Sequence, residues 1–296
     1  MYREFYGLIR SPFEMTPDPA FLYLGESHQE GLATLVYGVR ARKGFVLLTG
    51  EVGTGKTTLL HSLLAQLDPS TASAFLFNPR LDTDDFFRIL FDEFGIEKHC
   101  RTKGEYLLAL NAFLIERLQK NETALLIIDE AQNLSPDMLE EVRLLSNLET
   151  PTSKLLQIML VGQPELNDVL GRPELRQLRQ RIVLRHNLRP FTQAEVDDYV
   201  DERLRLAGYS GKGIFNRAAR EELFAVTGGI PRLINIVCDG ALLTGYGRGL
   251  STLGRDVIRE VAGDLKLCDD SGSDGERLGV EAPAPRRRGW LRRRRR

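Results

Sequence analysis

The segment from residue 50 to residue 57 has the residue types and the spacing of a phosphate-binding loop. It reads Gly50-Glu-Val-Gly-Thr-Gly-Lys-Thr57, which matches the pattern G-x-x-x-x-G-K-[ST]. Glycines let successive backbone amides point at phosphate groups, and a following helix adds the positive end of its dipole. The expected ATP-binding residues are Gly50, Glu51, Val52, Gly53, Thr54, Gly55, Lys56, Thr57 and Thr58.

Lys56 and Thr57 have separate expected roles. In loops of this type the lysine reaches the β- and γ-phosphates, and the next hydroxyl is a ligand of Mg²⁺, so ATP and Mg²⁺ are the expected cofactors. A glycine-rich turn that matches by accident is the alternative. The match, however, follows an apolar strand-like run at 44–50 and precedes a helix-like run at 57–67, which is the order that such a loop requires.

Asp129 and Glu130 are the second group of candidates, because they directly follow the apolar run 125–128. Open parallel sheets bind ligands at the carboxyl ends of their strands. Asp129 is predicted to hold Mg²⁺ through a water molecule, and Glu130 to act as the general base for the attacking water. An acidic pair after a strand also serves as a helix cap, but the upstream glycine loop favours catalysis.

Gln163, Arg176 and Arg181 are further catalytic candidates. Gln163 follows the apolar run 155–161, where its amide could bond the γ-phosphate or the attacking water; a turn residue that caps the next helix is the alternative. Arg176 and Arg181 lie in a basic helical segment. In an oligomer, one of them could stabilise transition-state charge at a neighbouring subunit's γ-phosphate. Arginines on a helix surface are otherwise solvated.

Arg232 lies in the sequence Gly228-Gly-Ile-Pro-Arg232. The glycines permit a tight turn, and proline suits the first position of a helix. Because cations are unfavourable at a helix N-terminus, an arginine there indicates an anionic partner. We expect Arg232 to face the phosphates from a second domain, with a solvated loop arginine as the alternative.

These candidates require a sheet that brings them together. Apolar runs recur at 44–50, 74–77, 124–128 and 155–161, and they alternate with helix-like segments. This alternation predicts an α/β fold of the P-loop NTPase kind, with a parallel sheet flanked by helices. After residue 190 only helical patterns follow, which predicts a small all-helical lid domain.

The composition divides the chain into four expected parts. An N-terminal strap rich in aromatic residues and prolines covers 1–25, and the P-loop ATPase domain covers 26–190. The helical lid covers 191–268. A disordered linker with an arginine-rich tail covers 269–296, where Asp, Ser, Gly, Glu and Pro give way to arginine.

Charge and cysteine usage exclude several classes of protein. Eight of the 40 Lys and Arg residues lie in 286–296, which leaves 32 basic against 41 acidic residues; an acidic body lacks the charge expected for binding nucleic acid. Three cysteines without CxxC spacing indicate neither zinc nor disulfides.

No run of roughly 18 apolar residues marks a membrane span, so a cytoplasmic location is expected. No chemistry is assigned to His28, His61, His99 or His186.

The tail 286–296 combines its arginines with Trp290 and Leu291. At an anionic membrane surface each arginine contributes about 1 kcal/mol, and the two apolar residues suit the headgroup region. Contact with the inner face of the cell membrane is therefore one expectation. Nucleic acid would attract the same charges, and a solvated disordered tail is the alternative to both.

Together the motifs resemble the AAA+ superfamily, in which Arg232 has the position of the second sensor arginine. The N-terminal part of the chain contains Tyr2-x-x-Phe5-Tyr6-Gly7-Leu8, Pro12-Phe13, Pro17-Asp18-Pro19-x-Phe21-Leu22-Tyr23 and Leu35-x-Tyr37-Gly38. With these residues it resembles the ExeA/GspA family of secretion-associated ATPases, particularly the short XrtA-associated (PEP-CTERM locus) branch, and the resemblance extends from Tyr2 to about Leu267.

The resemblance implies an ATPase that self-associates with ATP, for example as a hexamer. It also implies partners in the inner-membrane export or assembly machinery, in envelope secretion or exopolysaccharide export. Larger members carry a transmembrane helix and a peptidoglycan-binding domain after the ATPase, and neither is expected here. A DNA-associated ATPase of the transposition-helper kind is the alternative function, and a nucleotide-dependent scaffold with negligible hydrolysis is a third.

Overall fold

The computed structural model describes residues 1–14, 21–77, 82–211 and 213–267. Four sequence-based expectations lie outside these residues: the part of the N-terminal signature at 17–19, the disordered linker, the arginine-rich tail, and Cys268. Cys100 and Cys238 are free thiols.

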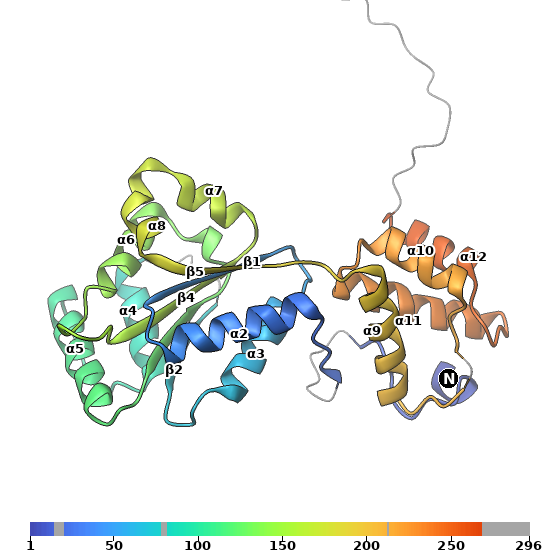
Figure 1. Cartoon of the computed structure of the whole chain (residues 1–296), viewed down its shortest axis with the longest axis horizontal. Coiled ribbons are helices and arrows are strands. Elements are labelled where there is room, and N and C mark those ends of the chain that lie inside the picture. The colour runs from blue at the N-terminus through green and yellow to red at the C-terminus, as the bar shows by residue number, and fades with distance from the viewer. Residues whose placement is uncertain (15–20, 78–81, 212, 268–296) are drawn as a thin grey trace, which may run out of the picture.

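A five-stranded parallel sheet occupies one end of the molecule (Figure 1). Its spatial order is β2-β3-β4-β1-β5, so β4 lies between β1 and β3. The three central strands, β3, β4 and β1, are buried along their whole length because helices cover both faces of the sheet, and the predicted α/β fold is confirmed. The strands are β1 (Phe45–Gly50), β2 (Ala72–Leu76), β3 (Ala124–Ile128), β4 (Leu156–Gly162) and β5 (Ile182–Leu188).

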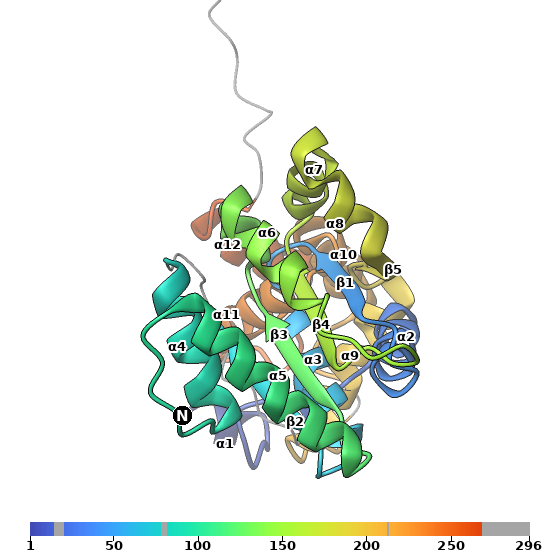
Figure 2. The same cartoon turned by 90° about the vertical axis from the view of Figure 1, so that its left-hand side faces the viewer.

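The two faces of the sheet carry different helices, because successive side chains of a strand point to opposite faces. Val46 and Leu48 share one apolar cluster with α2 and α3, whereas Phe45 and Leu47 share another with the helices on the opposite face (Figure 2). The first pair is α2 (Glu26–Arg40) and α3 (Lys56–Gln66). The opposite set is α4 (Thr83–Phe94), α5 (Lys103–Gln119), α6 (Pro136–Leu145), α7 (Glu165–Gly171) and α8 (Arg176–Arg181), with short 3-10 turns η2 (Ala131–Asn133) and η3 (Pro173–Leu175).

A helical unit with an apolar core of its own follows β5 (Figure 1). It consists of α9 (Gln193–Leu206), α10 (Arg217–Thr227), α11 (Pro231–Gly247) and α12 (Arg255–Asp264). Its helix starts are encoded locally: Thr192 and Glu195 form a capping box at α9, Asn216 caps α10, and Pro231 occupies the first turn of α11. The expected domain boundary near residue 190 falls between β5 and α9.

The N-terminal strap packs on this helical unit. The short helix α1 (Tyr2–Phe5) precedes Phe13 and Phe21, which are buried in the core of the unit. The Tyr2 hydroxyl donates to the Asp239 carboxylate at 2.6 Å, and the Tyr6 hydroxyl donates to the Leu250 carbonyl at 2.9 Å. The strap therefore links the beginning of the chain to its last helices.

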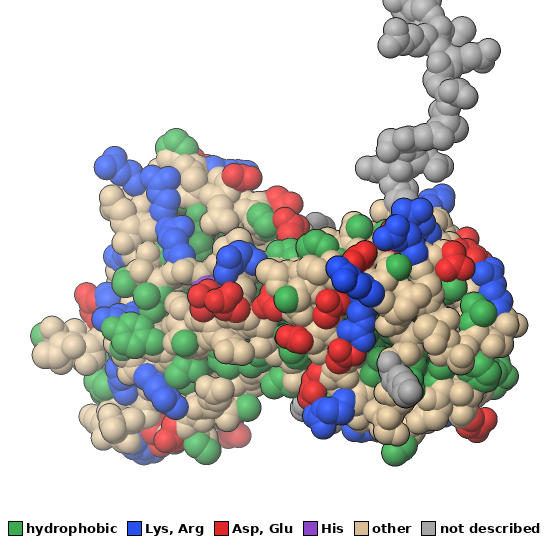
Figure 3. All heavy atoms as spheres, turned by 45° about the vertical axis from the view of Figure 1, so that its right-hand side comes forward, with side chains coloured by type: hydrophobic (Ala, Val, Ile, Leu, Met, Phe, Trp, Pro, Cys, Tyr) green, Lys and Arg blue, Asp and Glu red, His purple; other side chains and the backbone are tan. Residues whose placement is uncertain are grey.

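The face of the molecule in Figure 3 is mixed in charge. On the face in Figure 3, basic and acidic side chains alternate over the body, with small apolar groups between them. None of the helices in the described part of the chain combines the length and the apolar character that crossing a bilayer requires.

Candidate active site

The loop between β1 and α3 has backbone geometry that requires its glycines. Gly53 has φ +83° and Gly55 has φ +99°, a region that residues with a Cβ rarely adopt. A Cβ on Gly53 would lie 2.7 Å from the Cβ of Arg232, and one on Gly55 would lie 3.1 Å from Nε2 of His28. The glycines thus allow the loop to wrap closely beneath α11 and directly before the N-terminus of α3.

Among the described residues, the buried ammonium of Lys56 has hydrogen-bond partners in the backbone alone. Its Nζ donates to the carbonyl oxygens of Gly50 at 2.7 Å and of Glu51 at 3.1 Å. Within the described ranges no carboxylate lies within ion-pair distance of it, although Asp129 and Glu130 are near enough to raise its pKa. Burial is the larger effect and lowers the Lys56 pKa. A buried cation of this kind is stabilised by an anion, which a nucleotide phosphate supplies.

The strand order brings the other candidates to the same edge of the sheet. Asp129 and Glu130 directly follow β3, Gln163 directly follows β4, and the phosphate-binding loop follows β1. Because β4 lies between the other two strands, Gln163 is placed between the acids and the loop. Burial raises the pKa of the Asp129 carboxyl because it disfavours the charged form. A cation beside the carboxylate would stabilise that charged form.

Glu130 is held in an unusual conformation. Its φ is +51° and its ψ +38°, a left-handed region that is costly for residues other than glycine and that recurs at active sites. The Gln163 Nε2 donates to Glu130 Oε2 at 3.2 Å, and the Gln132 side-chain amide donates to the same oxygen. Two amides therefore orient the carboxylate.

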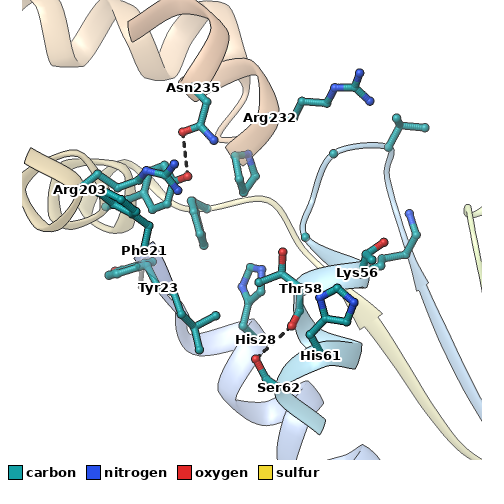
Figure 4. Close-up of a pocket in the computed structure, with 18 of the residues that line it drawn as sticks. Phe21, Tyr23, His28, Lys56, Thr58, His61, Ser62, Arg203, Arg232 and Asn235 are labelled. Carbon is teal, nitrogen blue, oxygen red and sulfur yellow. Dashed lines mark hydrogen bonds between the residues drawn. The ribbon is translucent and has the colours of Figure 1, made fainter. Parts of the chain in front are cut away.

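A cavity of about 830 Å³ joins these groups to the helical unit. One end is polar and contains the loop, the acids and Arg232, whereas the other is rich in aromatic side chains from the strap and α9 (Figure 4). The lining residues on which the site depends are Phe21, Tyr23, His28, Gly53, Gly55, Lys56, Thr57, Thr58, Asp129, Glu130, Phe191, Tyr199, Arg203, Arg232 and Asn235.

The structure brings Arg232 to the loop from α11. Its backbone N–H donates to the Gly53 carbonyl at 3.2 Å, and Figure 4 shows its side chain extending past the loop that precedes Lys56. The side chain is exposed, so it can turn toward a ligand in the cavity.

Arg176 and Arg181 are not brought to the cavity of their own chain. Arg181 donates from Nη1 to the Arg143 carbonyl at 3.3 Å and to the Ser146 hydroxyl. Arg176 is exposed at the beginning of α8. Neither lines the cavity.

The oxygen donors fit a magnesium ion. Thr57 and Asp129 both line the polar end of the cavity, and hydroxyl and carboxylate oxygens are ligands that Mg²⁺ prefers. In the parts of the chain that the structure covers, no cluster of three or more His, Cys, Asp or Glu could enclose a metal by itself. This suits an ion whose remaining ligands are phosphate oxygens and water.

Sequence reasoning missed His28. It is buried under the loop, with Nε2 2.9 Å from the Thr54 carbonyl oxygen, and its ring packs against Phe191 at 5.1 Å between centroids. The spacing of the histidines in the sequence did not indicate a role for His28, because its partner is a backbone group 26 positions away. His61 also lines the cavity.

Comparisons with known proteins agree with this geometry. The AAA domain family matches residues 39–170, which include the loop, the acids and Gln163. Over 275 residues, or 92% of this chain, the sequence is 43% identical to General secretion pathway protein A of Aeromonas hydrophila. The chain spans 50% of the length of that protein.

Solved structures with the same fold have distant sequences. Cdc6p from Pyrobaculum aerophilum matches with a TM-score of 0.66 and 17% identity, over 86% of this chain and 70% of that chain. The ORC2 protein of Aeropyrum pernix, solved in ADPNP-ADP complexes, matches with a TM-score of 0.62 and 17% identity, over 86% and 71% of the two chains. These similarities show the fold alone.

The family assignment rests on the identity over nearly the whole chain, on the AAA domain match, and on the parallel sheet that presents the predicted loop and acids at one edge. The chain belongs to the ExeA/GspA family of AAA+ ATPases.

Proposed function

We propose that this ATPase binds MgATP in the cavity between the sheet and the helical unit, with the triphosphate at the loop 50–57. The observation that carries the proposal is the placement of β4 between β1 and β3, because it puts the buried Lys56 ammonium, the Gln163 amide and the Glu130 carboxylate along one sheet edge.

Each polar group has a distinct proposed role. Lys56 neutralises charge on the β- and γ-phosphates, and Arg232 adds a second positive charge from α11. Glu130 accepts the proton of the attacking water. Gln163 now donates to Glu130; when a γ-phosphate is present, the same amide can donate to it instead, which would release the carboxylate to orient the water.

Thr57 and Asp129 would hold the magnesium ion, Asp129 through a water molecule. When bound, Mg²⁺ offsets the negative charge that develops on the phosphate oxygens. The remaining residues of the loop, including Thr54 and Thr58, supply backbone donors and helix-terminal amides for the phosphates.

The assembly and the cellular role extend this proposal. An ATP-dependent oligomer, such as a hexamer, would allow Arg181 or Arg176 to reach the nucleotide of a neighbouring subunit, which agrees with their distance from the cavity of their own chain. The similarity to General secretion pathway protein A supports a role in envelope secretion or exopolysaccharide export, with partners in the inner-membrane machinery. The tail 286–296 would bring the protein to the inner face of the membrane from the cytoplasm.

The face in Figure 3 presents no continuous basic surface that would suit nucleic acid, and the acidic balance of residues 1–285 is unfavourable for binding it. The export role is therefore preferred over a DNA-associated helper function.

The test compares ATP turnover by the wild-type chain with that of Glu130→Gln. We expect the substitution to lower turnover by about 100-fold or more, because the general base is lost, while ATP binding persists. Glu174→Gln, which changes an exposed carboxylate outside the cavity, is the matched control. Equal turnover by the wild type and Glu130→Gln would remove Glu130 from the mechanism. A failure of the wild type to bind ATP would overturn the whole proposal.

A further inference from the structure

Besides His28, whose Nδ1 is buried without a partner among the described residues, a second polar side chain of the cavity has unused hydrogen-bonding capacity. Asn235 of α11 is 9% exposed and lines the cavity. Its Oδ1 accepts a hydrogen bond from the Tyr199 hydroxyl at 2.8 Å. Its Nδ2 has no protein partner among residues 1–14, 21–77, 82–211 and 213–267. This nitrogen is open to the cavity and is not enclosed by protein atoms, so its N–H groups can donate to an acceptor of a bound ligand.

The orientation of this amide is fixed by its neighbours. Because the Tyr199 hydroxyl donates to Oδ1, the Asn235 amide has Nδ2 on the opposite side. Figure 4 shows the nitrogen turned away from the dashed bond, toward the space between α11 and the phosphate-binding loop. Asn235 therefore presents donors, and no acceptor, to a ligand in the cavity.

Arg203 holds the Tyr199 ring in place. Its guanidinium lies 5.4 Å from the centroid of Tyr199 and 4.9 Å from that of Phe21. It also donates to two strap carbonyls, those of Pro12 at 2.5 Å and of Glu14 at 3.2 Å. These contacts connect the strap, α9 and Asn235 in one rigid arrangement around the aromatic end.

The position of Asn235 suits the base of a nucleotide better than its phosphates. Arg232 contacts the loop at Gly53, and Asn235 is three residues further along the same helix, about 4.5 Å away along the axis and on the same face. Tyr23, Phe191 and Tyr199 meet there, with ring centroids 5.3 to 5.6 Å apart. Aromatic side chains are the surfaces on which planar bases stack.

We propose that Asn235 recognises the adenine of ATP, with Nδ2 donating a hydrogen bond to one of the ring nitrogens N1, N3 or N7. The proposal rests on the proposed function, because it requires the triphosphate to be bound at Lys56. Tyr199 is the positioning residue, since it keeps the donor side of the amide toward the base. Asn235 thereby contributes to affinity and to choice of base, and not to the chemistry at the γ-phosphate.

Deaza analogues of ATP test this contact, because each replaces one ring nitrogen by C–H and removes one acceptor. The affinities of the full chain for ATP, 1-deaza-ATP, 3-deaza-ATP and 7-deaza-ATP would be measured by calorimetry with Mg²⁺. We expect one analogue to bind the wild type about two- to tenfold more weakly than ATP, the size of one hydrogen bond. Asn235→Leu should bind ATP as weakly as the wild type binds that analogue, and should bind ATP and the analogue equally.

Control variants and a ligand without a base show whether weaker ATP binding by Asn235→Leu comes from the lost contact with adenine. Asn111→Leu, on α5 and away from the cavity, should behave as the wild type. Tyr199→Phe keeps the ring but frees the Asn235 amide to rotate, so this variant should lose less affinity when ATP is replaced by the analogue. The variant provides a second test if Asn235→Leu does not fold. Inorganic tripolyphosphate, which has no base, should bind the wild type and Asn235→Leu equally.

The outcomes distinguish this inference from the proposed function. If the wild type binds ATP and all three analogues with equal affinity, or if Asn235→Leu and the wild type lose the same factor with the same analogue, the contact with adenine is wrong while ATP binding stands. Weaker binding of tripolyphosphate to Asn235→Leu would place its effect at the phosphates and also overturn the inference. A wild-type chain that binds no ATP overturns both proposals.

Discussion

The backbone N–H of Arg232 donates a hydrogen bond to the carbonyl oxygen of Gly53 over 3.2 Å. The first turn of α11 thus rests directly on the phosphate-binding loop, and the absence of a side chain at Gly53 is what permits the approach. A Cβ at this position would lie 2.7 Å from the Arg232 Cβ and 3.1 Å from Ile230 Cγ2. The position of the helical unit and the shape of the loop are therefore coupled.

Gly53→Ala should separate α11 from the loop. The substitution places a methyl group against Arg232 and forces a non-glycine residue to φ +83°, which alone costs about 1–2 kcal/mol. We expect a lower melting temperature and ATP affinity reduced by about tenfold or more, measured by thermal unfolding and calorimetry. Gly104→Ala, within α5 and with only one distant neighbour, is the control; it should leave the ATP affinity unchanged and should not lower the melting temperature, because alanine favours a helix more than glycine does. A Gly53→Ala chain with wild-type affinity would show that the contact is dispensable.

Magnesium binding should weaken with acid at a higher pH than for an ordinary aspartate. Burial raises the pKa of Asp129, so a proton competes with the ion above the usual range near about 3.9. The apparent Mg²⁺ affinity of the ATP-bound chain, titrated between about pH 5 and pH 8, should fall as the pH falls. Asp129→Asn should bind the ion weakly throughout, with a flatter profile. A wild-type profile that matches the profile of Asp129→Asn would contradict the role of Asp129.

Subunit mixing tests whether Arg181 acts on a neighbouring subunit. Arg181 donates to the Arg143 carbonyl and to Ser146, and does not line the cavity of its own chain. Arg181→Ala and Glu130→Gln should each be inactive alone, with losses of up to about 10³- to 10⁵-fold for the arginine. A mixture should recover activity, because some interfaces would combine a wild-type Arg181 with a wild-type Glu130. Arg176→Ala takes the same test. Mixtures as inactive as the separate variants would exclude an arginine supplied by a neighbour.

Local motifs made much of the site predictable from sequence. Lys56 and Thr57 belong to one short pattern, and Asp129 and Glu130 end an apolar run, so neighbouring residues alone indicated their chemistry. The parallel sheet followed from the alternation of apolar runs and helical segments. The order of the strands did not, because a sequence lists strands in chain order and leaves open that β4 lies between β1 and β3.

Residues that act through distant contacts could not be recognised. His28 contacts a backbone carbonyl of the loop and lies in no pattern of its own. Asn235 follows Arg232 by three residues in the same segment, but its orientation comes from Tyr199 on another helix, so the segment alone did not indicate its role. Arg181 was identified as a candidate from its basic helix, but its direction away from the cavity depends on the packing of α6 against α8. Tertiary packing supplies this information, and local sequence does not.

His28 should make stability depend on pH below neutrality. Burial lowers its pKa, although the Thr54 carbonyl acts in the opposite direction. The unfolded chain takes up a proton near about pH 6.5, where folded His28 stays neutral, so its contribution to stability is present above that pH and is lost as the pH falls toward the lower folded pKa. Urea unfolding at several pH values should show this loss for the wild type and a smaller one for His28→Gln. Burial also lowers the pKa of His186. The dependence of the free energy of unfolding on pH should therefore be weaker still in the double variant with His186→Gln. Identical slopes for the wild type and His28→Gln would show that His28 is protonated equally in both states.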